Sequence, residues 1–138
     1  MARKPFDLMD SVPAALRGLI LDFEWSRERL WTLDLPVRAM AIEQLRWLLA
    51  LPWWSDEGVH FAISPDQVRA DPGRHPVQYA RTMAADLTLP LHVLVRQGRV
   101  VTMLDGMHRL LKADLAGMQL VQTKPVPPRC LDIIACSR

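Results

Sequence analysis

The chain has 138 residues, of which half are hydrophobic, and its formal net charge at pH 7 is +2. This length and apolar content are sufficient for one domain with a hydrophobic core, which we expect to span residues 1–138. The small net charge gives no support for a basic, DNA-binding surface, so we do not expect DNA as a partner.

Neither membrane insertion nor secretion is predicted. The longest apolar run, residues 48–54, is interrupted by Pro52 and is much shorter than the roughly 18 residues of a membrane span. The basic residues near the N-terminus are not followed by the apolar segment of a signal peptide. Two cysteines, Cys130 and Cys136, do not form a zinc-binding framework. We therefore expect a cytoplasmic protein with reduced thiols and no membrane partner.

The first expected element is a docking helix within residues 1–29. Asp10 or Ser11 is a possible N-cap, and Pro13 lies early in the helix, where proline is tolerated. Apolar residues follow at helical spacing on one stripe, namely Val12, Leu16, Ile20 and Phe23. Residues 30–126 are expected to form the core of the domain, and residues 127–138 a tail that packs back on it.

Residues 30–35 alternate as a strand would, until Pro36 interrupts the pattern. A second short strand is expected over residues 37–40, and the apolar residues from 42 to 49 then predict a helix that Pro52 ends. Three tryptophans lie on or just after this helix: Trp47, Trp53 and Trp54. A nucleobase platform is one interpretation, but we prefer packing in the core, which is where aromatic side chains ordinarily contribute.

A polar loop is expected at residues 55–58. Ser64 then begins a helix with a capping box, in which Pro65 takes the first position and Gln67 reaches back to the backbone of Ser64. That helix is short, because an Asp-Pro-Gly turn follows it. A further helix is expected over residues 75–88.

Most of the candidate functional residues lie in the next segment, residues 91–117. Alternation across residues 91–95 and 100–104, separated by a Gln-Gly turn, predicts a β-hairpin. His92 alternates with the apolar residues of the first strand and is interpreted as a structural histidine with satisfied hydrogen bonds. Apolar residues from Met107 onward recur at helical spacing until Gly117. The tight turn between the second strand and this helix presents free backbone N–H groups and a positive dipole end, the usual basis of a phosphate site.

Asp105 and Gly106 lie at this junction. Asp105 has two compatible interpretations: it caps the helix, or it acts catalytically as a Mg²⁺ ligand or as the acceptor of a hydroxyl proton. Gly106 provides the turn and lets a ligand approach the backbone.

The expected phosphate ligands are Gly106, Met107, His108, Arg109 and Lys112. Arg109 is the stronger candidate because its guanidinium is a planar fork, and His108 is a second donor. Both lie in the first helical turn, where a cation is unfavourable for the helix, and this favours a functional role. A solvated polar face would give the same pattern, and Lys112 is equally well explained as a surface residue.

The sequence Leu-Asp-Gly-Met-His-Arg-Leu-Leu-Lys-Ala, at residues 104–113, resembles small members of the ParB/sulfiredoxin fold that carry the Asp-Gly-x-His-Arg form. The resemblance is firm over residues 88–126 and weaker over residues 33–86. It implies an α+β nucleotide-binding domain with a small mixed sheet and packed helices. Members differ in chemistry: sulfiredoxin uses ATP to repair a sulfinic acid, free serine kinases phosphorylate serine, and ParB proteins bind and hydrolyse CTP.

Departures from these patterns separate the subfamilies. Met107 stands where sulfiredoxin requires a cysteine, so thiol repair is not expected. ParB proteins usually have two arginines after the glycine and a helix-turn-helix region downstream, whereas this chain has His108 and Arg109. The free serine kinases also use an upstream acidic residue, for which Glu43 is the candidate and Glu57 the reserve.

These patterns predict a nucleotide-binding protein. We expect it to transfer a phosphoryl group from ATP, ADP or CTP, with Mg²⁺, to a small hydroxyl compound, as a small-molecule kinase or nucleotide hydrolase. One alternative is a non-catalytic nucleotide-sensing or partner-binding module. Another is a ParB-like protein associated with nucleic acid, or a nuclease.

Overall fold

A four-stranded sheet forms the centre of the computed structural model, which describes residues 2–138, so that Met1 of the expected domain lies outside it. The strands occur in the order β1-β6-β4-β5. β4 and β6 are parallel, whereas the other neighbouring strands are antiparallel. Their bounds are Arg38–Ala41 for β1, Leu91–Arg96 for β4, Arg99–Asp105 for β5 and Leu120–Val126 for β6.

The predicted hairpin is the β4–β5 pair. Gln97 and Gly98 both have positive φ angles, 52° and 75°, as a tight turn between twisted antiparallel strands requires. β6 was not predicted as a strand. Val121 and Thr123 of β6 are buried and alternate with exposed residues, and the Thr123 hydroxyl donates to the carbonyl of Arg38 in β1.

The helices predicted after residue 63 are present. α2 is Pro65–Ala70, α3 is Pro76–Met83 and α4 is Met107–Leu115. α2 begins with the predicted capping box, in which Ser64 and Gln67 exchange hydrogen bonds of 3.1 and 2.8 Å. The predicted polar loop at residues 55–58 is only partly a loop: a second hairpin is formed by β2 at Trp54–Asp56 and β3 at Val59–Ile63, and residues 57–58 form its turn.

The strand predicted at residues 30–35 is wrong, because residues 30–32 belong to helix α1, Arg27–Thr32, and residues 33–35 form no strand. The Ser26 hydroxyl caps the helix by accepting from the backbone N–H of Arg29, and Leu30 is buried. Leu30 and Leu33 are three residues apart, a spacing that also fits one face of a helix. Alternation over six residues did not distinguish the two structures.

The predicted N-terminal docking helix is also wrong. Residues 2–25 are mostly extended and contain two short 3₁₀ helices, η1 at Met9–Ser11 and η2 at Ala14–Leu16. Gly18, with φ of 81°, breaks the chain direction after η2. The helix expected at residues 42–49 is likewise divided into two 3₁₀ helices, η3 at Ile42–Gln44 and η4 at Arg46–Ala50.

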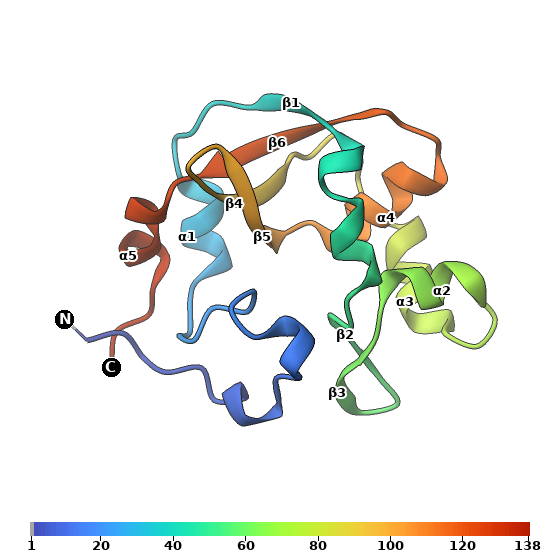
Figure 1. The fold of residues 1–138 in the computed structure, drawn as a ribbon, viewed down its shortest axis with the longest axis horizontal. Coiled ribbons are helices and arrows are strands. Elements are labelled where there is room, and N and C mark those ends of the chain that lie inside the picture. The colour runs from blue at the N-terminus through green and yellow to red at the C-terminus, as the bar shows by residue number, and fades with distance from the viewer. Residues whose placement is uncertain (1) are drawn as a thin grey trace.

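The sheet separates two clusters of buried residues. In Figure 1, α1 and α5 lie toward one end of the molecule, and α2, α3 and α4 toward the other. One cluster joins Leu91 and Val93 of β4 to α2, α4 and η4. The other joins Leu94 of the same strand to α1 and to the tail, whose predicted packing is confirmed by η5 at Pro128–Cys130 and helix α5 at Leu131–Ile134. Helices therefore cover both faces of the mixed sheet, and the predicted α+β class is confirmed.

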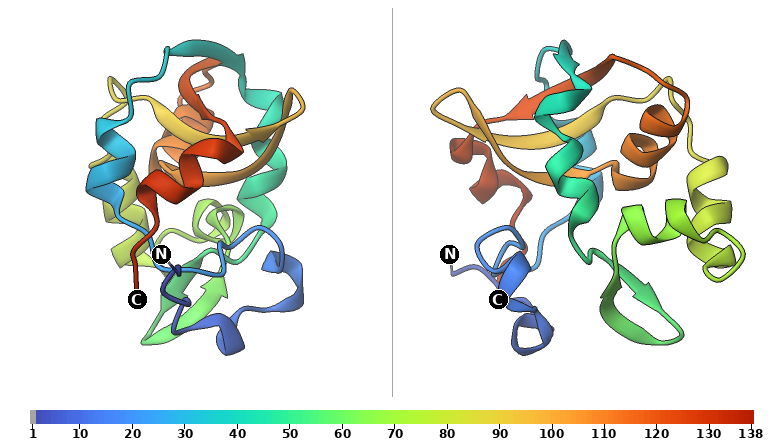
Figure 2. Two further views of the ribbon diagram at one scale, coloured as in Figure 1. Left: turned by 90° about the vertical axis from the view of Figure 1, so that its left-hand side faces the viewer. Right: turned by 45° about the vertical axis from the view of Figure 1, so that its right-hand side comes forward.

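The two ends of the chain lie side by side (Figure 2). The backbone N–H of Lys4 donates to the carbonyl of Cys136, and that of Cys136 donates to the carbonyl of Glu24, both at 2.8 Å. Isolated bridges also join Arg3 to Ser137 and Trp25 to Ala135. Within residues 2–138, no helix combines the length and the apolar character needed to cross a membrane.

Candidate functional site

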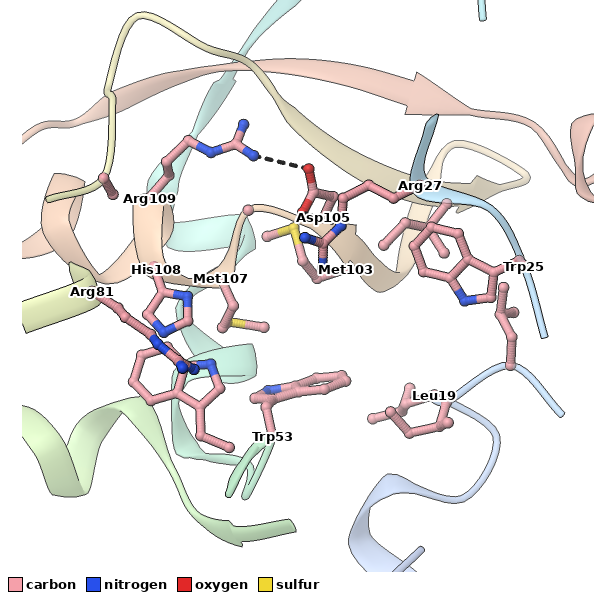
Figure 3. A pocket seen from close by; sticks show the side chains of 16 residues that line it. Leu19, Trp25, Arg27, Trp53, Arg81, Met103, Asp105, Met107, His108 and Arg109 are labelled. Carbon is pink, nitrogen blue, oxygen red and sulfur yellow. Dashed lines mark hydrogen bonds and ion pairs between the residues drawn. The ribbon is translucent and has the colours of Figure 1, made fainter. Parts of the chain in front are cut away.

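A cavity of about 640 Å³ opens where β5 meets α4 (Figure 3). The junction itself, residues 105–109, lines one side. Residues 19–21 and Trp25, from the N-terminal segment, line the opposite side, and Trp53 and Trp54 form a further wall. The predicted phosphate junction thus lies at a concave site built from segments that are far apart in the sequence.

Gly106 is the N-cap residue of α4 and has a φ of 117°. A Cβ atom at this position would lie 2.7 Å from Cδ2 of Leu91, so the close approach that requires glycine is to β4. Because Gly106 occupies the cap position, the prediction that Asp105 caps the helix is wrong. The ladder of α4 begins with the N–H of Leu110, which leaves the N–H groups of the first turn free beside the cavity.

The Asp105 carboxylate is surrounded by donors and its side chain is 11% exposed. Its Oδ2 accepts from Nη2 of Arg109 at 2.9 Å and from the indole N–H of Trp31 at 2.8 Å. Its Oδ1 lies 3.7 Å from Nε of Arg27. A Mg²⁺ ion at Asp105 would have to displace these donors. Residues 2–138 contain no group of three or more His, Cys, Asp or Glu side chains arranged to hold a metal ion.

The two cations predicted to bind phosphate make contacts within the fold. Arg109, 13% exposed, donates through Nη1 to the carbonyl of Pro90 and through Nη2 to Asp105. Lys112 donates to the carbonyls of Met83 and Ala85, at 2.8 and 2.7 Å, and so completes the end of α3. Lys112 does not line the cavity.

His108 lines the cavity but is not a cation. Its ring stacks on that of Trp54, with centroids 4.2 Å apart and planes 9° from parallel, and its Nε2 is 2.8 Å from Oε1 of Gln78. Burial lowers the pKa of His108 to about 4, helped by the charges of Arg81 and Arg27 and opposed by Asp105. At neutral pH the imidazole is therefore uncharged.

Two arginines that were not predicted as site residues lie at the cavity. Arg27 is the first residue of α1, and its side chain is 66% exposed. Arg81 belongs to α3 and is exposed. No local pattern could have identified Arg27, because its segment was not recognised as helical. Arg81 follows no motif, and only the packing of α3 against α4 brings it to the site.

The acidic candidates lie elsewhere. Glu43 is 83% exposed at its side chain and faces Arg46 at 3.7 Å, whereas Glu57 is in the β2–β3 turn. Neither lines the cavity. His92 is buried, as expected, but neither of its ring nitrogens has a hydrogen-bond partner within residues 2–138, so the expected satisfaction is wrong.

The three tryptophans have different positions. Trp54 is buried in the core, as preferred, and stacks on His108. Trp53 lines the cavity, and its indole N–H donates to the carbonyl of Leu48 at 2.6 Å, which fixes the ring. Trp47 is exposed and lies outside the cavity.

No protein-family model, curated protein or solved structure matches this chain. The resemblance to the ParB/sulfiredoxin fold therefore stays a prediction from the sequence motif.

Proposed function

We propose that the protein binds a nucleoside di- or triphosphate in this cavity and transfers its terminal phosphoryl group to a small hydroxyl compound. The observation that carries the proposal is the meeting, in one cavity, of an uncapped helix start, two exposed arginines and an aromatic wall. The volume of about 640 Å³ lies within the range of small-ligand sites. The Asp-Gly-x-His-Arg resemblance supports the same assignment.

The phosphates would lie at the start of α4. Free N–H groups of its first turn and the positive end of the helix dipole favour an anion there. Arg27 and Arg81 add charge from two other elements, and a guanidinium is well suited to bind phosphate oxygens. These two residues take the place that the sequence motif had suggested for Arg109 and Lys112.

The base and sugar would lie toward the aromatic wall. Trp53 and Trp25 offer flat apolar surfaces at the cavity, and Leu19 lies near them (Figure 3). Stacking of a base on an aromatic ring contributes about 1–3 kcal/mol with little dependence on sequence. Phosphoryl transfer itself requires positioning and charge stabilisation more than covalent participation of the protein. In this proposal Mg²⁺ enters with the phosphates of the nucleotide, not as an ion held by Asp105.

A non-catalytic nucleotide-binding module is the second candidate. The observation that favours it is the state of Asp105, whose oxygens are already engaged by Arg109, Trp31 and Arg27. Engaged in this way, the carboxylate holds parts of the fold together, which suits a module that binds without catalysis. Conversion of the bound nucleotide to its shortened form, by transfer or by hydrolysis, distinguishes a catalyst from this module.

The test is a panel of ATP, ADP, CTP and GTP, each with and without Mg²⁺, followed by the melting temperature and by calorimetric titration. At least one nucleotide should raise the melting temperature, since a ligand of the folded state stabilises it. Arg27→Gln and Arg81→Gln should each weaken that nucleotide by roughly tenfold or more through loss of a charge-assisted contact.

Arg96→Gln is the matched control, because Arg96 is an exposed arginine at the end of β4 and lies outside the cavity. It should leave the affinity unchanged. The proposal fails if no nucleotide moves the melting curve at millimolar concentration. It also fails if the control weakens binding as much as the two cavity variants do.

A further inference from the structure

His108 has an unusually fixed ring. Trp54 covers one face of the imidazole, and Gln78, a buried residue of α3, holds Nε2. The backbone of His108 is fixed as well, because the residue belongs to the first turn of α4. A side chain with this many constraints presents its remaining nitrogen, Nδ1, in one direction.

Gln78 also determines where the imidazole proton lies. Its Nε2 donates to the carbonyl of Ser55 at 3.1 Å, so its Oε1 is the atom that faces His108. An amide oxygen only accepts hydrogen bonds, and Nε2 of His108 must therefore be the donor. In the neutral ring the proton is on Nε2, and Nδ1 carries a free lone pair.

The lone pair of Nδ1 is available at the cavity. The His108 ring lies on the cavity wall, between Arg81 and Met107 (Figure 3), and within residues 2–138 Nδ1 has no hydrogen-bond partner. The charged groups that act on the ring are Arg81 of α3, Arg27 of α1 and Asp105 of β5. Burial and the two cations lower the pKa of the ring more than the carboxylate raises it, so the imidazole is neutral at pH 7.

We propose that Nδ1 of His108 accepts the proton of the attacking hydroxyl, and that Gln78 is the positioning residue that holds the required tautomer. This inference rests on the proposed phosphoryl transfer. The hydroxyl oxygen forms a bond to the terminal phosphorus as the bond from that phosphorus to the bridging oxygen breaks. The electron pair of the broken bond leaves with the shortened nucleotide. The hydroxyl proton passes to Nδ1 and then to solvent.

A weakly basic nitrogen is adequate for this role. In a loose phosphoryl-transfer transition state the bond to the attacking oxygen is only slightly formed, so little positive charge develops on the hydroxyl. Its proton can therefore move late, to a weak base. With a pKa of about 4, protonated His108 would lose its proton to solvent quickly at neutral pH, and Nδ1 would be free for the next turnover. His108 is thus assigned the role that the sequence had suggested for Asp105.

The experiment measures formation of the shortened nucleotide, ADP from ATP and CDP from CTP, with water and L-serine as acceptors, across a range of pH, together with nucleotide titrations. His108→Gln should lower kcat by about 10²-fold or more while the affinity for nucleotide stays near that of the wild type. Gln78→Glu places a carboxylate against Nε2–H and should raise the pKa of His108. The acid limb of the kcat profile should then move from near pH 4 toward neutrality.

If His108 had only a structural role, His108→Gln would not lower kcat selectively, and Gln78→Glu would not move the acid limb of the kcat profile. Nitrogen NMR of histidine-labelled protein gives a readout that does not depend on turnover, with His108→Gln identifying the signals. It should show a protonated Nε2 and an unprotonated Nδ1 at neutral pH, and a higher titration midpoint in Gln78→Glu.

The outcomes separate the two proposals. If the wild type binds no nucleotide, the proposed function fails, and the role of His108 fails with it. If it binds nucleotide but does not cleave it, the transfer reaction and the role of His108 both fail, and the non-catalytic module remains. If it cleaves nucleotide and both variants keep the kcat profile of the wild type, only the assignment of His108 is overturned. An Nδ1-protonated ring in the NMR spectrum would also overturn it.

Discussion

Asp105 and Arg109 are four residues apart and form an ion pair, and Arg109 also donates to a backbone carbonyl. Arg109 ties the start of α4 to the carbonyl of Pro90, just before β4, and Asp105 receives the indole N–H of Trp31 from α1. The pair therefore links α4 and β5 to α1 and to the segment before β4. It supports the walls of the cavity, and under the proposed function the ligand contacts fall to Arg27, Arg81 and the backbone.

Arg109→Ala should consequently destabilise the protein. The substitution removes hydrogen bonds to Pro90 and Asp105 and leaves a poorly exposed carboxylate with fewer donors, so we expect a loss of about 1–3 kcal/mol. Urea denaturation measures it. Arg99→Ala, at the exposed tip of the β4–β5 hairpin, is the control and should have little effect. Equal stability of Arg109→Ala and the wild type would show that the pair is not structural.

At the scale of residues, the motif residues meet at a cavity, but their contacts there differ from those that the motif suggested. Asp105, His108 and Arg109 line the cavity, and their partners include Trp31, Gln78 and Pro90 respectively. These partners come from other elements, and spacing within one helix carries no information about them. Glu43 was chosen as the upstream acidic residue from the resemblance alone, and in the structure it lies outside the cavity.

Elements with their own local signals were predicted well. The capping box at Ser64, the hairpin turn at Gln97-Gly98 and the apolar spacing of α4 each depend on residues close in sequence. α1 and the N-terminal segment were not, because short alternating or helical spacings there are compatible with several structures. β6 depends on pairing with β1 and β4, which is decided by tertiary structure.

The capping box gives a prediction for α2. Ser64→Ala removes the acceptor of the Gln67 N–H, and the helix and protein should lose about 1 kcal/mol. Ser55→Ala is the matched control: the Ser55 side chain is exposed, and only its backbone carbonyl is used, by Gln78. Chemical denaturation of both variants measures the difference. If the two substitutions cost the same, the capping bond contributes nothing beyond a generic serine replacement.

For the whole molecule, the buried histidines predict how stability depends on pH. Burial lowers the folded-state pKa of His108 to about 4 from the ordinary 6.5, and burial also lowers that of His92. Between these two pH values the unfolded chain binds more protons than the folded one, so the free energy of unfolding falls as pH falls through 6.5 toward 4.

Asp114 extends this loss to lower pH. Burial acts to raise its pKa, but hydrogen bonds and charges from Arg69 and Arg46 lower it overall from 3.8, so its contribution to stability is lost as pH falls below that value. Urea midpoints at a series of pH values measure the whole dependence, and His108→Gln should make it less steep above pH 4. Stability that is constant or increases on acidification through this window would contradict the assigned states of both histidines.

The backbone bonds that join residues 4, 24 and 136 also have a consequence for biosynthesis. Residues 19–25, one wall of the cavity, emerge early from the ribosome, but their neighbours at residues 134–136 emerge more than a hundred residues later. The nascent chain can therefore assemble its sheet and α4 while that wall still lacks its bonds to residues 134–136. Under the proposed function, the cavity becomes able to enclose a nucleotide only after these residues have emerged.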